Sequence, residues 1–117
     1  MGTIPSTTGN CSNLESIFSD HNSLHGTTPT EISILENLIY FLVYENYLTG
    51  LIPPGIFSRL LKLDVFVASN NNQIGAIPYE IGSLKNLTSL AFSSSGMYES
   101  ITYYFSNLSS LEGLGIS

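Results

Sequence analysis

The residues that could do chemistry in this chain are two histidines, one cysteine and nine carboxylates. His21 and His25 are four residues apart, a spacing that lets two histidines bind one metal ion when both lie on a helix. They flank Asn22 in a segment that reads as a turn, and no acidic or thiol partner repeats nearby. We therefore expect an exposed pair of histidines and no metal site.

Cys11 is the single cysteine of the chain. A thiol used in catalysis or redox chemistry needs a nearby base or a second thiol, and the sequence supplies neither. A free thiol also behaves as a small apolar side chain that is readily buried. We expect Cys11 to fill a core position, with no catalytic role and no cofactor.

A repeated unit organises the rest of the chain, and its clearest copy is the segment from Leu38 to Pro53, LIYFLVYENYLTGLIP. Its apolar residues follow one another at steps of three and then two residues before an Asn ends the run. That spacing fits neither an amphipathic helix nor a simple alternating strand. It matches L-x-x-L-x-L-x-x-N-x-L, in which a short strand bends into a turn anchored by the Asn.

Copies of this unit fill the chain at intervals of 24 or 25 residues. The Asn that ends the run recurs at Asn22, Asn46 and Asn71, and the apolar columns recur with it. Chance does not align so many columns. The repeat predicts parallel strands near residues 15–19, 39–43, 64–68, 88–92 and 112–116.

The unit resembles the plant extracellular subclass of leucine-rich repeats, which continues into Gly-x-Ile-Pro, as at Gly50 to Pro53. The resemblance covers the whole chain and implies an α/β fold. That fold is a right-handed, curved solenoid with a parallel β-sheet on its concave face and loops and short 3-10 turns on its convex face. We expect residues 1–117 to form one array of four turns plus partial repeats at both ends, without caps, as a fragment of a longer solenoid.

The recurring asparagines have a mechanical role that the spacing predicts. An inward-turned Asn amide can donate to and accept from the backbone of its own turn and of the adjoining turn. Stacked from turn to turn, such amides satisfy peptide groups that would otherwise be buried without a partner. The predicted ladder consists of Asn22, Asn46 and Asn71.

The register after Asn71 is ambiguous. Counting from Leu63 makes Asn71 the anchor but places Gln73 in a core column, whereas sliding by one residue places Ile74 there. We expect the extra residue of this 25-residue turn to form a local bulge.

Charge and hydropathy exclude several classes of function. The net charge is −6 with only three Lys and Arg residues, which argues against nucleic acid and against an anionic membrane surface as partners. No apolar run reaches the roughly 18 to 20 residues of a spanning helix, so we expect no membrane span in this chain. The first residues also lack the pattern of a signal peptide.

The columns of the repeat contain no recognisable catalytic site. An enzyme needs ionisable groups that converge, and no two carboxylates share one column in successive turns. The alternative solenoid, a parallel β-helix that cleaves acidic polysaccharides, would need clustered Asp with Lys or Arg on one face. We expect a binding protein that is not an enzyme.

The face of the predicted sheet that points away from the core is unusually apolar. Resembling plant repeats place Asp or Ser between the two core residues of each strand, whereas this chain places apolar residues there. This predicts a binding strip for a peptide, a steroid-like ligand or a partner receptor, although drift of a sticky surface is an alternative. The predicted binding residues are Phe18, Tyr40, Leu42, Tyr44, Val65 and Val67.

Three Asn-x-Ser/Thr sequons begin at Asn10, Asn86 and Asn107. Each Asn lies on the returning side of its turn, so glycans attached there would leave the concave face free. The sequons give mild support to a secreted parent protein.

The resemblance implies part of the extracellular domain of a plant leucine-rich-repeat receptor-like kinase or receptor-like protein. Such a parent recognises a peptide, hormone or microbial pattern at the outer face of the plasma membrane, sometimes with a co-receptor. Two alternatives are an inhibitor of secreted pectin-degrading enzymes and a non-functional truncated array. We also expect self-association through the uncapped ends.

Overall fold

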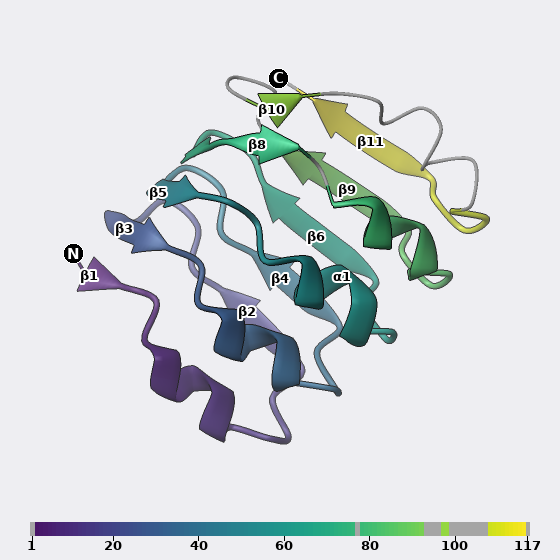
Figure 1. Cartoon of the computed structure of the whole chain (residues 1–117), viewed down its shortest axis with the longest axis horizontal. Coiled ribbons are helices and arrows are strands. Elements are labelled where there is room, and N and C mark those ends of the chain that lie inside the picture. The colour runs from purple at the N-terminus through teal and green to yellow at the C-terminus, as the bar shows by residue number, and fades with distance from the viewer. Residues whose placement is uncertain (1, 77, 93–96, 99–107, 117) are drawn as a thin grey trace.

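The computed structural model describes residues 2–76, 78–92, 97–98 and 108–116. Each complete turn contains a strand of one sheet, a strand of a second sheet and a short helical segment (Figure 1). Successive turns stack side by side, so the helical segments form one row and the strands form parallel sheets. This is the predicted leucine-rich-repeat solenoid.

The five-stranded sheet is the one that the repeat predicts, and we call it the concave sheet. All neighbouring strands are parallel and paired in register, in the order β11-β9-β6-β4-β2. Every strand lies within its predicted segment, so the predicted strand positions are confirmed. The strands are β2 (Ser16–Phe18), β4 (Tyr40–Leu42), β6 (Val65–Ala68), β9 (Ser89–Phe92) and β11 (Gly113–Ile116).

A second, four-stranded parallel sheet follows the Asn turns, and we call it the lateral sheet. The sequence predicts one parallel sheet on the concave face, with loops and short 3-10 turns on the convex face, so a second sheet is a correction. It forms because the residues after each Asn are extended and stack at the spacing of the turns. Its strands are β1 (Gly2–Thr3), β3 (Leu24–Thr27), β5 (Tyr47–Gly50) and β7 (Asn72–Gln73), and a separate pair joins β8 (Gly75–Ala76) to β10 (Met97–Tyr98).

The glycine of the repeat lies in the lateral sheet in a left-handed conformation. Gly26 has φ +80° and Gly50 has φ +79°, a region that residues with a Cβ adopt only at a cost. A Cβ at Gly50 would also lie 2.8 Å from Cγ2 of Thr27. The glycine is therefore required both by its own conformation and by the turn beside it.

The helical row follows the prolines. Each segment begins directly after an extended Pro at the N-cap, which cannot continue a strand ladder. The segments are η1 (Ser6–Asn10), η2 (Thr30–Ile34), α1 (Pro54–Arg59) and η3 (Tyr79–Ser83).

The extra residue of the 25-residue turn lies in α1. The amide of Leu60 bonds to the carbonyl of Ile56, four residues earlier, whereas the amide of Leu35 bonds to Ile32, three residues earlier. One α-helical turn thus replaces a 3-10 turn and absorbs the residue. The bulge predicted near Asn71 was wrong.

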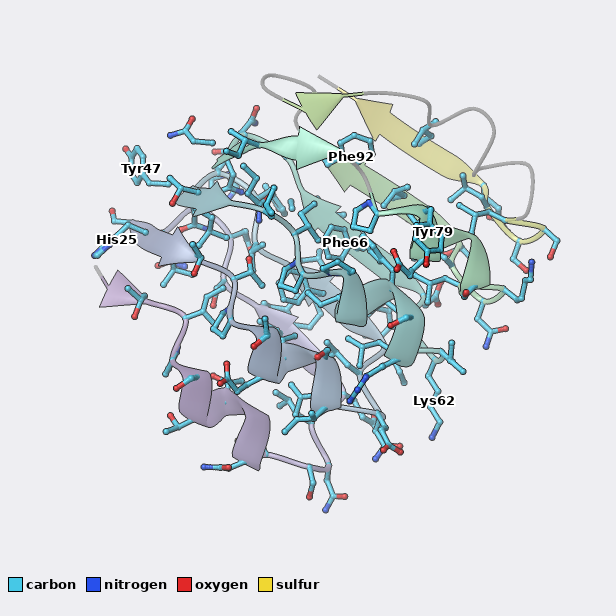
Figure 2. All side chains as sticks on the ribbon, in the orientation of Figure 1. His25, Tyr47, Lys62, Phe66, Tyr79 and Phe92 are labelled. Carbon is cyan, nitrogen blue, oxygen red and sulfur yellow. The ribbon has the colours of Figure 1, made fainter. Side chains whose placement is uncertain are left out.

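Phenylalanines from successive turns stack inside the solenoid. Phe41 and Phe66 have nearly parallel rings with centroids 5.1 Å apart, and Phe57 of α1 meets Phe66 edge-on at 5.1 Å. All three are buried, and Figure 2 shows Phe66 between the concave sheet and the helical row. This aromatic core fixes the distance between strands and helical segments.

Cys11 is exposed, contrary to the prediction that it fills the core. Residues of the same column in later turns, Leu35, Leu60 and Leu84, are completely buried. Cys11 ends η1 in the first turn, where no preceding turn of this chain covers it, and its neighbour Leu14 is only half-buried. In the first turn, therefore, a side chain is not buried merely because its repeat position is a core position in later turns.

Asn46 acts as the repeat predicts. Its Nδ2 donates to the carbonyl oxygen of Ser19 in the preceding turn at 2.7 Å, and to Val43 in its own turn at 2.9 Å. Its Oδ1 accepts from the amide of Leu24 at 3.0 Å. One buried amide thus connects two turns.

Asn71 repeats this pattern one turn later. Its Nδ2 donates to the carbonyl oxygen of Val43 at 3.0 Å, and its Oδ1 accepts from the amide of Leu48 at 2.9 Å. Asn22 does not join the ladder, because it is exposed and donates to the carbonyl oxygen of Asp20 within its own turn at 2.9 Å. The partners that Asn22 would need in an earlier turn correspond to positions before residue 1.

Gln73 lies in the core column, which settles the register in favour of counting from Leu63. Gln73 is 3% exposed and Ile74 is 52% exposed. The Nε2 of Gln73 donates at 3.2 Å to Oγ1 of Thr28, which is also buried and lies two turns away. Thr28 stands in the column that Ile52 fills, so two polar departures from apolar columns satisfy each other.

Candidate functional site

The predicted binding residues lie together on the open face of the concave sheet. Side chains alternate along a strand, so the neighbours of the buried Phe41 and Phe66 face outward. The register pairs Tyr40 with Val65 and Leu42 with Val67, which makes the surface continuous from turn to turn. We call this set the apolar strip: Phe18, Tyr40, Leu42, Tyr44, Val65 and Val67.

The aromatic residues are the most exposed part of the apolar strip. Phe18 is 60% exposed and Tyr40 is 37% exposed, while Leu42 beside them is half-buried. The rings of Phe18 and Tyr40 stack with centroids 6.1 Å apart and an interplanar angle of 24°. Large exposed apolar surface of this kind is typical of an interaction site.

A charged cluster borders the apolar strip where the strands end. The Nδ1 of His21 donates to Oδ2 of Asp20 at 2.8 Å, and its Nε2 lies 3.0 Å from Oε2 of Glu45 in the next turn. The ring of Tyr44 meets the imidazole edge-on, with centroids 5.2 Å apart. We call Asp20, His21, Tyr44 and Glu45 the histidine cluster.

The contacts of the histidine cluster shift its protonation equilibria in opposite directions. The hydrogen bond to Asp20, with the charge of Glu45, raises the pKa of His21 above its ordinary 6.5. The same hydrogen bond lowers the pKa of Asp20 below 3.8. The negative charge of Asp20 raises the pKa of Tyr44. His21 therefore favours its cationic form, held between two carboxylates.

The backbone places His21 and Glu45 in equivalent positions. Both immediately precede a repeat Asn and both are left-handed, with φ of 55° and 58°. Asn70 fills the same position of the third turn with φ 56°. The left-handed residue turns the chain out of the concave strand, so side chains of this column lie side by side at the sheet edge.

Carboxylates also border the opposite edge of the apolar strip. Glu15, Asp64 and Glu112 each stand immediately before a strand of the concave sheet. Since the strands are parallel and in register, these residues share one edge. Asp64 accepts a hydrogen bond from the hydroxyl of Thr88. The strip therefore lies between two acidic borders.

The pairing of His21 with His25, four residues away in sequence, does not predict the histidine cluster. His25 instead lies in β3 and projects from the lateral sheet, as Tyr47 does (Figure 2). Both histidines are exposed, as expected. The signal that would have found the cluster is the repeat period, since His21 and Glu45 are 24 residues apart.

The Lys and Arg residues of the chain lie away from the apolar strip. Arg59 is in α1, and Lys62 and Lys85 are in the turns that lead from the helical row to the strands. Lys62 points outward in Figure 2 and donates to Oδ1 of Asn37 at 2.7 Å. Two of these cations, Arg59 and Lys62, line a groove of about 410 Å³ on the helical side.

The sequons have different structural settings. Asn10 is exposed at the end of η1. Asn86 is exposed in the turn before β9, and its Nδ2 donates to the carbonyl oxygen of Leu61 at 3.4 Å. Asn107 lies outside the described residues. Glycosylation at these three positions stays a prediction.

In the described ranges, no group of three or more His, Cys, Asp or Glu side chains is arranged to hold a metal ion. Within those same ranges, no helix is both long enough and apolar enough to cross a membrane.

The repeat, the stacked parallel sheets and the Asn ladder define the chain as a leucine-rich-repeat solenoid. Comparison with known proteins adds that it is homologous to plant receptor-like proteins. It is 30% identical over 118 residues to receptor-like protein 39 and 36% identical over 114 residues to receptor-like protein 35, both of Arabidopsis thaliana. Each alignment covers 97% of this chain, which spans 13% and 12% of the length of these relatives.

A solved structure has the same fold. The plant peptide hormone receptor RGFR1, in complex with RGF2, superposes with a TM-score of 0.82 at 32% identity. The superposition covers 97% of this chain and 19% of that receptor. No model of a known protein family matches the chain.

Proposed function

We propose that this chain is a ligand-binding segment of the extracellular part of a plant receptor-like protein, with no enzymatic activity of its own. The ligand lies across the apolar strip. The observation that carries this proposal is the exposure of Phe18 and Tyr40 on a sheet face that no other described element covers. The homology to receptor-like proteins and the likeness to a peptide hormone receptor support it.

The shape of the site favours an extended peptide or a partner protein over a steroid-like ligand. A small apolar molecule is normally held in a concave pocket that buries 70 to 90% of its surface. The apolar strip is a sheet face open along its length. One hollow lies elsewhere, against the helical row, and another lies between the lateral sheet and the start of the helical row. An extended chain gains contact from several turns at once. A co-receptor would bind beside such a ligand.

Leu42→Asp is the direct test of the proposed site. The change introduces a charge at the centre of the apolar strip, and the outward direction of Leu42 predicts that the fold survives. Ligand binding should be lost while the circular dichroism spectrum is unchanged. The matched control is Ile34→Asp, which places the same charge at a 50% exposed apolar residue of η2 and should leave binding intact. Unfolding of Leu42→Asp, or binding that survives it, would contradict the proposal.

Secretion and glycosylation follow as parts of the same proposal. A receptor-like parent places these repeats outside the cell, where Asn10, Asn86 and Asn107 are acceptors for glycans. Glycans at the exposed Asn10 and Asn86 stand clear of the apolar strip. Mass spectrometry of the chain secreted from plant cells should find them occupied, and treatment with a glycosidase should leave ligand binding unchanged.

Self-association of the isolated chain is a further expectation. In this chain β2 and β11 are the outer strands of the concave sheet, and Leu114 in β11 is 48% exposed. Unpaired strand edges beside exposed apolar residues favour pairing between copies. Analytical ultracentrifugation of the chain at tens of micromolar should show dimers or larger species, and a purely monomeric sample would contradict this.

A further inference from the structure

The apolar strip has a charge pattern that specifies the chemistry of its occupant. Glu15, Asp64 and Glu112 border one edge, and Asp20 and Glu45 border the other. The three Lys and Arg residues of the chain lie outside both borders, in α1 and in the turns. The cation nearest to the strip is the imidazole of His21, which its hydrogen bonds to Asp20 and Glu45 hold in place.

We propose that the occupant of the apolar strip is an extended peptide with Lys or Arg side chains among apolar ones, and that His21 competes with those cations for Asp20 and Glu45. This inference rests on the proposed function and names the class of ligand. Its apolar side chains cover Phe18, Tyr40 and Leu42. Its basic side chains reach the acidic borders on either side.

Charge complementarity decides between basic and acidic peptides. Like charges brought together across an interface are costly, and opposite charges both speed and orient association. An acidic peptide would meet carboxylates at both edges, with only His21 to offset them. A basic peptide meets carboxylates at both edges, and the chain's net charge of −6 attracts it from a distance.

The position of His21 adds a dependence on pH. The titratable groups that face the imidazole are Asp20 from its own turn and Tyr44 and Glu45 from the next turn, and none of them is a cation. When His21 is protonated, it forms ion pairs with Asp20 and Glu45 and so competes with a basic ligand. When His21 is neutral, Asp20 and Glu45 are available to the ligand, so basic peptides bind more tightly as pH rises through the titration of His21.

The first experiment is selection of a displayed library of random dodecapeptides on the complete chain, with counter-selection on the Leu42→Asp variant. Peptides rich in Lys, Arg and apolar residues are expected. A double variant, Asp20→Asn with Glu45→Gln, should lower the affinity for the selected peptides by about two- to fivefold, which is the effect that exposed ion pairs usually have. Selection of acidic or uncharged peptides that still depend on Leu42 would overturn this inference and leave the proposed function standing. Absence of any Leu42-dependent peptide would overturn the proposed function itself.

The second experiment measures one selected Lys-containing peptide, free of His and carboxylates, at about pH 5 and about pH 8. The wild-type chain should bind it more tightly at the higher pH. His21→Asn should bind with much less dependence on pH, and Asn suits the left-handed backbone because Asn70 occupies the same column. Equal dependence on pH in both chains would overturn the role of His21.

Discussion

The first turn and the two turns after it carry an Asn at the same repeat position, yet they use it differently. Asn22 is exposed and bonds within its own turn, whereas Asn46 is buried and bonds to two turns. Cys11 and Leu35 differ in the same way. The turn itself decides which side chains can face inward, and the neighbouring turn decides whether they are buried. Because stability in a solenoid is a sum over turns and their interfaces, equal substitutions should have unequal effects.

The asparagines provide the largest expected contrast. Asn71→Ala removes the partner of the buried amide of Leu48 and a hydrogen bond to the carbonyl of Ala68, while the carbonyl of Val43 keeps its bond from Asn46. An unsatisfied buried group costs about 1 to 3 kcal/mol. We expect the free energy of unfolding to fall by about 2 to 3 kcal/mol. Asn22→Ala, on the exposed side, should cost less than about 0.5 kcal/mol. Urea unfolding followed by circular dichroism measures both, and equal losses would refute the comparison.

The buried pair of Gln73 and Thr28 gives the next largest effect. Gln73→Leu matches the column of Leu48 but leaves the Thr28 hydroxyl without its partner, at a cost of about 1 to 3 kcal/mol. Adding Thr28→Ile, which matches Ile52, should restore stability to within about 0.5 kcal/mol of the wild type. Additive losses in this double-mutant cycle, again from urea unfolding, would show that the two side chains are not coupled.

The glycines of the lateral sheet provide a smaller expected difference between the first turn and the second. A left-handed conformation costs about 1 to 2 kcal/mol for a residue with a Cβ. A Cβ at Gly50 meets Thr27 at 2.8 Å, whereas a Cβ at Gly26 meets Thr3 of the first turn at 3.2 Å. Gly50→Ala should therefore lower the melting temperature more than Gly26→Ala. The opposite order would mean that the first turn is packed more tightly around its glycine than the second.

The smallest expected effect comes from the histidine cluster, whose contribution to stability depends on pH. The pKa of His21 is raised by folding, so its contribution is present below the ordinary value of 6.5 and is lost as pH rises through the raised pKa. The pKa of Asp20 is lowered, so its contribution is lost as pH falls through that lowered value. His21→Asn should thus lower the melting temperature slightly at mildly acidic pH and not at alkaline pH. A difference that is constant with pH would contradict the ion pair.

Periodic features of the fold could be predicted from the sequence, and features that depend on one side chain reaching another could not. The columns ending at Asn46 and Asn71 predicted the strands and both ladder residues. The segments of the lateral sheet do not alternate regularly between apolar and polar residues, so the sequence predicts no strand at Leu24–Thr27 or Tyr47–Gly50. The contact from His21 to Glu45 spans one repeat and could have been found by comparing columns. The contact from Gln73 to Thr28 joins different columns, and no spacing rule indicates it.

The contact between Gln73 and Thr28 limits which repeats of the array can be exchanged for one another. Repeats of one length look interchangeable, and rearrangements that duplicate, delete or shuffle them would preserve every column. Thr28 and Gln73 are partners across the turn that lies between them, so moving either turn alone would set a polar side chain against an isoleucine or leucine column. The turns that carry Thr28 and Gln73 are therefore coupled as one block, and a designer who recombines such arrays should cut outside residues 28–73.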